Sequence, residues 1–269
     1  FNDLQERFFN KCPSLYKDNK IFFKEYFFYL GKTNYLLGQH KSAIEAFNKA
    51  EKDYLKNEKL FNKYFKDSFY FQNKKYYGRY GREEFEDQIK VEFLKEFLCF
   101  RGKALFHEAK YEEAIKDYDQ LIELDSSRPY FFLFRGIAKI EHNKICKKVK
   151  SFGIRSVSKD FDKAIQLFLH FQKEYFKEKQ AIEQIDWEDY DIKCWREDNL
   201  YLFKGDIDHA VINLSAYDYY YHRGLSNYYF KKYTKAINDF NRAIELNSKV
   251  ANIYYLRALT NFKLNNHNE

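Results

Sequence analysis

The side chains best suited to chemistry in this sequence are basic and aromatic, and their grouping favours binding over catalysis. Residues 61–82 hold six basic side chains, one acid and nine aromatic rings. Basic side chains neutralise phosphates and aromatic rings stack on bases, so this composition suits single-stranded nucleic acid. No motif of a known RNA-binding fold accompanies it. An irregular helix pair whose rings pack onto the rest of the chain is the alternative, and the sequence leaves both open.

A second basic segment, residues 142–159, holds six lysine and arginine side chains and no acid. Such a patch attracts an acidic protein surface or nucleic acid, or it is the solvated tip of two long helices. The candidate contact residues are Lys144, Lys147, Lys148, Lys150 and Arg155.

The opposite charge gathers in residues 183–198, which hold seven acids against two bases. Both tryptophans of the chain, Trp187 and Trp195, lie in this segment. Tryptophan is enriched among the residues that dominate binding energies, so the segment is a candidate contact for a partner. Folding back onto a basic segment is the structural alternative.

Signatures of catalysis and of metal binding are missing from the sequence. The four cysteines are far apart and form no C-x-x-C pair, and the seven histidines form no H-E-x-x-H cluster. No glycine-rich phosphate loop and no G-x-S-x-G motif occurs. We therefore expect a protein that is not an enzyme and that holds no metal and no cofactor.

Cysteine usage and hydropathy suggest where the protein works. Isolated cysteines fit small apolar side chains in a reducing intracellular compartment, cytoplasmic or organellar. No apolar run approaches the roughly 18 residues of a membrane span. The chain has no methionine, even at position 1, so we interpret it as a fragment or a processed form, and a removed N-terminal signal stays open.

One recurring spacing defines the elements that must position these side chains. A glycine is followed twelve residues later by Ala-Ile at Gly31 with Ala43-Ile44, at Gly102 with Ala114-Ile115, and at Gly224 with Ala236-Ile237. Gly136 precedes Ala164-Ile165 in the same way but sixteen residues late, which predicts an insertion in that unit. Ala258 stands 34 residues after Gly224, where a further glycine is expected.

Within each unit the apolar residues follow a helical period. Tyr233, Ala236, Ile237 and Phe240 show the i, i+3, i+4, i+7 spacing of an amphipathic helix. Glycine inside a helix costs roughly 0.5–1 kcal/mol against alanine, so its recurrence indicates helices that approach closely. The spacing predicts an all-α array of helix, short turn and helix.

These residues resemble the tetratricopeptide repeat (TPR) family, whose pattern has a small residue at position 8, an aromatic at 17, alanine at 20 and an aromatic at 24. The resemblance implies a right-handed superhelical solenoid of antiparallel helix pairs, with insertions. We expect a single array over residues 1–269. Clear units are predicted at 24–57, 95–128, 129–176 and 217–250, with a partial unit at 251–269 and degenerate regions at 58–94 and 177–216.

The resemblance also implies a concave face lined by the first helix of each unit. The residues at its lining positions are Phe28, Lys32, Tyr35, Lys103, Phe106, Tyr221, Leu225, Tyr228, Tyr229, Tyr255, Leu259 and Phe262. The N-terminal end is mixed and basic, and the C-terminal end is aromatic. Rigid rings give contact area at low entropic cost, so we expect the groove to bind an extended or helical apolar segment.

An arginine precedes the small residue in four units, at Arg101, Arg135, Arg223 and Arg257. Its recurrence predicts a structural role, with Asp117 and Asp239 as partners. The last unit has only its first helix, which we expect to be truncated or to dock onto a neighbouring subunit.

Together these features predict a non-catalytic scaffold that binds protein partners as a subunit or assembly factor of a larger complex. The alternative is an RNA-contacting repeat protein that uses residues 61–82 and 142–159.

Overall fold

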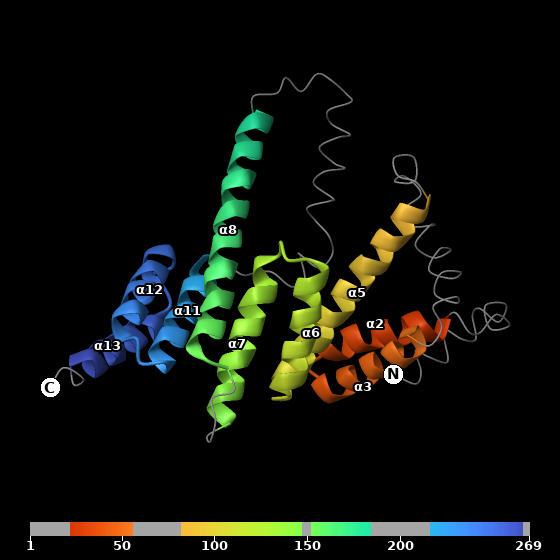
Figure 1. The fold of residues 1–269 in the computed structure, drawn as a ribbon, viewed down its shortest axis with the longest axis horizontal. Helices are drawn as coiled ribbons and strands as arrows, with labels where there is room; N and C mark the ends of the chain where they lie inside the picture. The colour runs from red at the N-terminus through yellow and green to blue at the C-terminus, as the bar shows by residue number, and fades with distance from the viewer. Residues whose placement is uncertain (1–21, 56–81, 147–151, 184–215, 266–269) are drawn as a thin grey trace. The chain divides into compact units, whose positions relative to one another are not determined.

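The computed structural model describes residues 22–55, 82–146, 152–183 and 216–265, and these segments are helices joined by tight turns (Figure 1). No strand occurs in these ranges. The helices are α2 (Phe22–Leu36), α3 (His40–Leu55), α5 (Arg82–His107), α6 (Tyr111–Leu124), α7 (Pro129–Ile145), α8 (Ile154–Glu183), α11 (Ala216–Tyr229), α12 (Tyr233–Leu246) and α13 (Ala251–Asn265). The predicted all-α fold class of paired helices is confirmed.

The described helices belong to two compact units, Phe1–Asp117 and Tyr118–Glu269, and the division falls inside α6. The first unit holds α2, α3, α5 and the start of α6, and the second unit holds the rest. A single array over residues 1–269 stays a prediction.

The turns that join α2 to α3, α5 to α6 and α11 to α12 each contain a residue in the left-handed backbone region. Gly38, Ala109 and Lys231 have φ values of 74°, 58° and 61°. In each case the backbone N–H of this residue donates to the carbonyl three residues earlier, at 2.9 to 3.0 Å. This is the usual way to satisfy the last carbonyls of a helix. Only Gly38 adopts the conformation without a steric cost from Cβ.

The small residues of the first helices lie directly against phenylalanine rings of the second helices. A Cβ added to Gly31 would come within 2.7 Å of the Phe47 ring. At Gly224 the corresponding distance to the Phe240 ring is 2.6 Å. The predicted close approach of the helices at these glycines is therefore confirmed.

The repeat predicted at 129–176 contains a shorter insertion than its alanine pattern predicts. Gly136 faces the ring of Phe161, and Arg135 pairs with Asp160, 25 residues later. In the flanking units the arginine pairs with an aspartate 16 residues later, so the insertion has nine residues rather than sixteen. The expected match of Ala164 to Ala236 is wrong.

The reason for this error is a second recurring alanine. Ala243 follows Ala236 by seven residues, and both side chains are fully buried. Ala164 follows Phe161 by three residues, as Ala243 follows Phe240, so Ala164 corresponds to the later alanine. Val157 fills the earlier position. Ala164 can be aligned with Ala236 or with Ala243. These positions are two helical turns apart, and the sequence pattern fits both.

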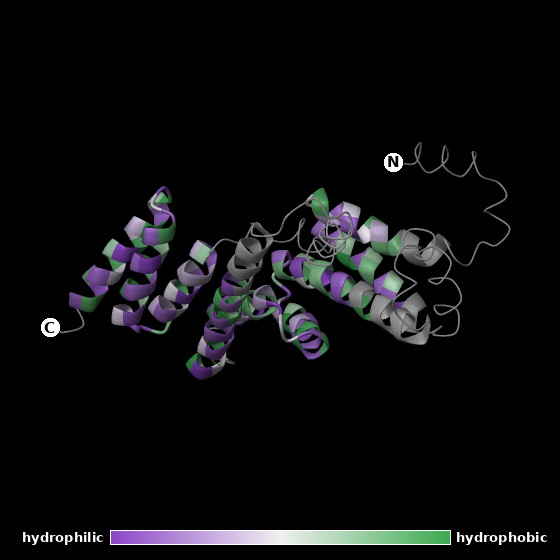
Figure 2. Ribbon diagram, turned by 90° about the horizontal axis from the view of Figure 1, so that it is seen from above, coloured by the Kyte–Doolittle hydropathy of each residue, from purple (hydrophilic) through white to green (hydrophobic). Residues whose placement is uncertain are grey.

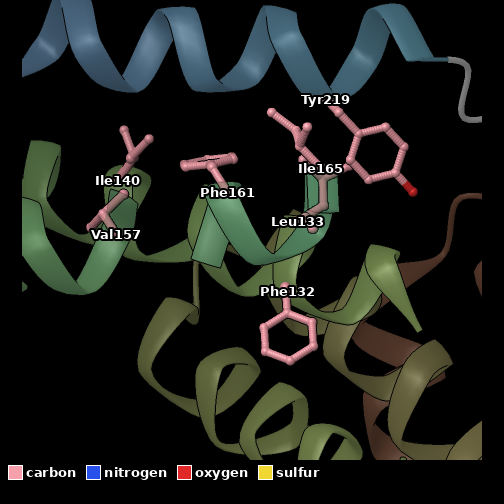
Figure 3. Packing of buried hydrophobic residues seen from close by; sticks show 8 residues of the cluster. Phe132, Leu133, Ile140, Val157, Phe161, Ile165 and Tyr219 are labelled. Carbon is pink, nitrogen blue, oxygen red and sulfur yellow. The ribbon is translucent and has the colours of Figure 1, made fainter. Parts of the chain in front are cut away.

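The core of the second unit joins α7, α8 and α11. Its buried members are Phe132, Leu133, Ile140, Val157, Phe161, Ala164, Ile165 and Tyr219. In Figure 3, Phe161 and Ile165 point toward the helix that carries Tyr219, whereas Phe132 points in the opposite direction. Figure 1 shows α8 continuing past the end of α7, and Figure 2 shows hydrophobic and hydrophilic residues interleaved along the helices, as amphipathic packing requires.

Candidate partner-binding surfaces

The predicted groove residues of α2 pack against other residues of the first compact unit. Phe28 is 1% exposed and its ring packs against Phe47. It therefore offers a partner no surface. Lys32 forms an ion pair with Glu96, and its ammonium lies 5.1 Å from the centre of the Phe100 ring.

Tyr35 belongs to an aromatic cluster that the sequence pattern does not reveal. Its ring lies 5.6 Å from the ring of Phe100 and 5.5 Å from that of His40. His40 and His107 stack with ring centres 4.3 Å apart and planes 7° apart. Burial lowers the pKa of His107, and the nearby His40 and Lys103 lower it further. These histidines are 67 residues apart, so spacing gives no signal of the pair.

Lys103 and Phe106 on α5 are half-buried. Burial lowers the pKa of Lys103, while neighbouring Cys99 acts in the opposite direction. Burial raises the pKa of the Cys99 thiol to about 11. The ring of Phe106 packs edge-on against Tyr111, with centres 5.2 Å apart. These side chains contribute to the packing of the first unit.

At the C-terminal end, the groove residues of α11 are partly buried. Tyr221, Leu225 and Tyr228 pack against a small core of Ala236, Phe240, Ala243 and Ile253. Asn252 of α13 donates a hydrogen bond of 3.0 Å to the Tyr221 hydroxyl. Tyr229 packs instead against the core that joins α7, α8 and α11. These rings of α11 are therefore only partly accessible to a partner.

Helix α13 presents the most accessible part of the predicted groove. Tyr255 is 65% exposed and Phe262 is 58% exposed, with half-buried Leu259 between them. These three residues stand at i, i+4 and i+7, so they form one stripe of the helix. An exposed apolar stripe of this kind is typical of a protein-interaction site.

Most of the predicted contact residues in the charged segments lie outside the described residues. Lys147, Lys148, Lys150, Trp187 and Trp195 are among the residues that are not described, as are residues 61–81. Lys144 pairs with Glu141 at 2.6 Å, and Arg155 is exposed. The ends of the insertion are joined by Asn143, whose Nδ2 donates to the Phe152 carbonyl at 2.7 Å and whose Oδ1 accepts from the Phe152 N–H at 3.1 Å.

The repeated arginines pair as the sequence predicts. Arg101 donates to both carboxylate oxygens of Asp117, at 2.9 and 2.6 Å, and Arg223 donates twice to Asp239. Burial alone would lower the pKa of Arg101, but hydrogen bonds and charge from Asp117 and Glu51 raise it overall. The predicted pairing of Arg101 with Asp117 and of Arg223 with Asp239 is confirmed.

Two of the repeated arginines make a second ion pair that the sequence pattern did not predict. Arg135 also pairs with Asp119 at 2.8 Å, and Arg223 also pairs with Asp162 at 2.9 Å. Asp162 stands two residues after Asp160, the partner of Arg135. One second helix therefore provides a carboxylate to the arginine of its own unit and another to the arginine that follows.

The described residues hold no cluster of three or more histidine, cysteine or acidic side chains that could bind a metal. Cys99 and Cys146 are free thiols. Within the same ranges, no helix has both the length and the apolar character needed to cross a bilayer.

Paired helices with small residues at their contacts, and with an exposed apolar stripe on a first helix, define a helical repeat protein of the kind that binds other proteins. Family models agree. A TPR repeat model matches residues 224–265, and tetratricopeptide repeat models match residues 96–128 and 25–54. The chain therefore contains tetratricopeptide repeats in these ranges, and the family typically forms non-catalytic interaction scaffolds.

Among solved structures, the chain resembles the crystal structure of MamA protein at 14% identity and a TM-score of 0.49, over 91% of this chain and 84% of that one. A likeness at this level says nothing about function. No curated protein matches the chain in sequence.

Proposed function

We propose that this protein is a non-catalytic scaffold that holds an apolar segment of a partner protein, as a subunit or assembly factor of a larger complex. The observation that supports this proposal is the exposed stripe of Tyr255, Leu259 and Phe262 on α13. A buried aromatic ring removes about 150–250 Å² from water, so two rings can dominate the affinity for a partner.

Partly buried rings on α11 extend this surface. Tyr221 is linked to α13 through Asn252 and its ring stacks on Tyr217, with centres 5.5 Å apart. These contacts hold the Tyr221 ring in place before a partner arrives, which lowers the entropic cost of binding. We assign the affinity to these C-terminal residues and a packing role to Phe28, Lys32, Tyr35, Lys103 and Phe106.

The test is to purify the tagged protein from its source at moderate salt, with and without nuclease, and to identify what accompanies it. We expect protein partners that survive nuclease. The double variant Tyr255→Ala/Phe262→Ala should lose them, because binding hot spots are centred on buried rings. Leu169→Ala on α8 is the matched control, since Leu169 is 44% exposed on another helix of the same unit.

The same experiment separates the RNA-contacting alternative. Partners that disappear after nuclease, and an affinity that falls steeply with salt, would make nucleic acid the ligand. Retention of all protein partners by the Tyr255→Ala/Phe262→Ala variant would refute the groove assignment.

A further inference from the structure

The two cysteines in the described ranges have very different surroundings. Cys99 is 0% exposed, and burial raises the pKa of its thiol to about 11. Such a thiol holds almost no thiolate at neutral pH, and only the thiolate is nucleophilic. Cys146, in contrast, is half-buried at the C-terminal end of α7. A small reagent in solution can therefore reach Cys146, whereas Cys99 is closed to it.

The thiol of Cys146 lies within hydrogen-bond distance of a histidine. Its Sγ and Nε2 of His142 are 3.5 Å apart. The two residues are four positions apart on α7, so their side chains share one face of the helix. The backbone N–H of Cys146 also donates to the His142 carbonyl at 3.0 Å. With the ring proton on Nδ1, Nε2 of His142 accepts the hydrogen bond of the thiol.

The imidazole of His142 is held in place by the far end of the insertion. His142 is 6% exposed, and its ring packs edge-on against Phe152 with centres 5.4 Å apart. Phe152 is tied to α7 by the two hydrogen bonds between its backbone and the Asn143 side chain. The histidine is therefore a base that is already oriented beside a nucleophile, which is the arrangement that activates a cysteine.

A thiolate at this position depends on the imidazole rather than on the helix. The carbonyl oxygens at the C-terminus of a helix carry partial negative charge and disfavour an anion. Lys144 forms an ion pair with Glu141 at 2.6 Å. Lys139 forms one with Asp160 at 2.8 Å. Transfer of the thiol proton to the ring creates an imidazolium beside the thiolate, and this opposite charge favours the ionised sulfur.

We propose that Cys146 is a site of reversible modification by small-molecule disulfides, with His142 as the base that activates its thiol. The thiol proton moves to Nε2, and the thiolate attacks one sulfur of the disulfide. An S–S bond to Cys146 forms while the S–S bond of the reagent breaks, and the leaving thiolate takes the proton from the imidazolium. Cys146 is thereby oxidised and half of the reagent is reduced to a thiol, so an excess of thiol reverses the step.

The modification site is separate from the predicted groove. Neither Cys146 nor His142 is a groove residue, and neither lies on the helices that carry the aromatic stripe. Loss of modification and loss of partner binding are therefore distinguishable results, and one does not imply the other.

The probe for the experiment is dithiodipyridine, which releases one absorbing thiopyridone for each thiol that it modifies. The full chain is used with Cys12→Ser/Cys194→Ser, because these two cysteines lie outside the described residues. Stopped-flow absorbance gives the rates, and mass spectrometry of peptides identifies the modified residue. We expect Cys146 to react in the folded protein and Cys99 to react only in guanidinium chloride. Dithiothreitol should restore both thiols.

The role of His142 is tested by His142→Gln in the same background. This change should slow the reaction of Cys146 at pH 7 about tenfold or more, since an unassisted thiol is only a few per cent thiolate there. His170→Gln is the matched control, because His170 is exposed on α8 of the same unit. It should leave the rate unchanged within about twofold, as expected of a site that makes no contact with the thiol.

A pH profile provides a second measurement that needs no substitution at His142. From pH 8.5 to 6.5 the rate of an ordinary thiol falls about fiftyfold, because only its thiolate reacts. Glutathione measured in the same buffers provides this reference. The rate of Cys146 should fall by less than about tenfold over the same range, since the imidazole accepts its proton.

Cys99 reports whether a variant is still folded, because its reaction in the absence of denaturant would reveal unfolding. Three results would overturn the inference. The first is a Cys146 that reacts no faster than Cys99 in the folded protein. The second is an unchanged rate in a His142→Gln variant that still protects Cys99. The third is a rate that follows the glutathione reference across the pH range, and this result decides the question even if His142→Gln unfolds the chain.

Discussion

Phe28 and Tyr255 are both the fifth residue of their predicted repeat units, which start at 24 and 251, yet Phe28 is 1% exposed and Tyr255 is 65% exposed. Phe28 is covered by the Phe47 ring and by Lys32. Tyr255 lies on a stripe that the described helices leave open. Repeat position therefore determines which face of a helix a residue occupies, while the neighbouring side chains decide whether a partner can reach it.

The strongest test of this comparison is to truncate both rings. Phe28→Ala should lower the free energy of unfolding by about 3–5 kcal/mol, because it removes buried contacts and leaves a cavity. Tyr255→Ala should change it by less than about 0.5 kcal/mol. Urea denaturation of both variants measures the difference. Equal losses of stability would show that exposure does not distinguish the two positions.

The small residues of α11 and α13 allow a second comparison. Gly224→Leu should cost about 1–3 kcal/mol or more, because even a Cβ there would meet the Phe240 ring at 2.6 Å. Ala258→Leu should be nearly neutral for folding, since Ala258 is exposed. Thermal unfolding checks both. A destabilised Ala258→Leu variant would mean that another part of the chain covers α13.

The titration of His222 should make the stability of the protein depend on pH. Burial lowers its pKa to about 4, against opposing contributions from Asp218 and Glu141 and a further lowering by Lys144. The folded state thus prefers neutral imidazole. Stability is full above the unfolded pKa of about 6.5 and is lost as the pH falls toward 4.

Between pH 7 and 5 we expect His222 to contribute a loss of about 1–2 kcal/mol. His222→Gln should flatten this part of the stability profile, measured by urea denaturation at each pH. His107→Gln should change the profile less, because His107 is more exposed. An unchanged profile in the His222 variant would contradict the assignment.

Substitutions in the turns of the two compact units should change the free energy of unfolding in opposite directions. Lys231→Gly should stabilise the second unit by about 1 kcal/mol, because lysine with a φ of 61° bears a steric cost that glycine avoids. Gly38→Ala should destabilise the first unit by a similar amount. Differential scanning calorimetry resolves shifts of this size, and a stabilising Gly38→Ala would contradict the turn geometry.

Much of the local architecture was predictable from spacing. The recurrence of Arg101 and Arg223 before a small residue predicted their pairing with Asp117 and Asp239, because a repeated charge on a helix contact needs a repeated counter-charge. The length of the insertion before Ala164 was not predictable, since alanines seven residues apart fit the same pattern two turns out of register. The stack of His40 on His107 was also hidden, because it joins residues far apart in sequence.

The sequence by itself determined the helices, their pairing and the faces they turn toward each other, because these follow from a short-range period that repeats. The tertiary structure alone decided which of those faces are covered. Phe28 and Arg223 are covered or paired by neighbouring side chains, whereas the described helices leave Tyr255 exposed. Burial depends on contacts between helices that no local pattern encodes.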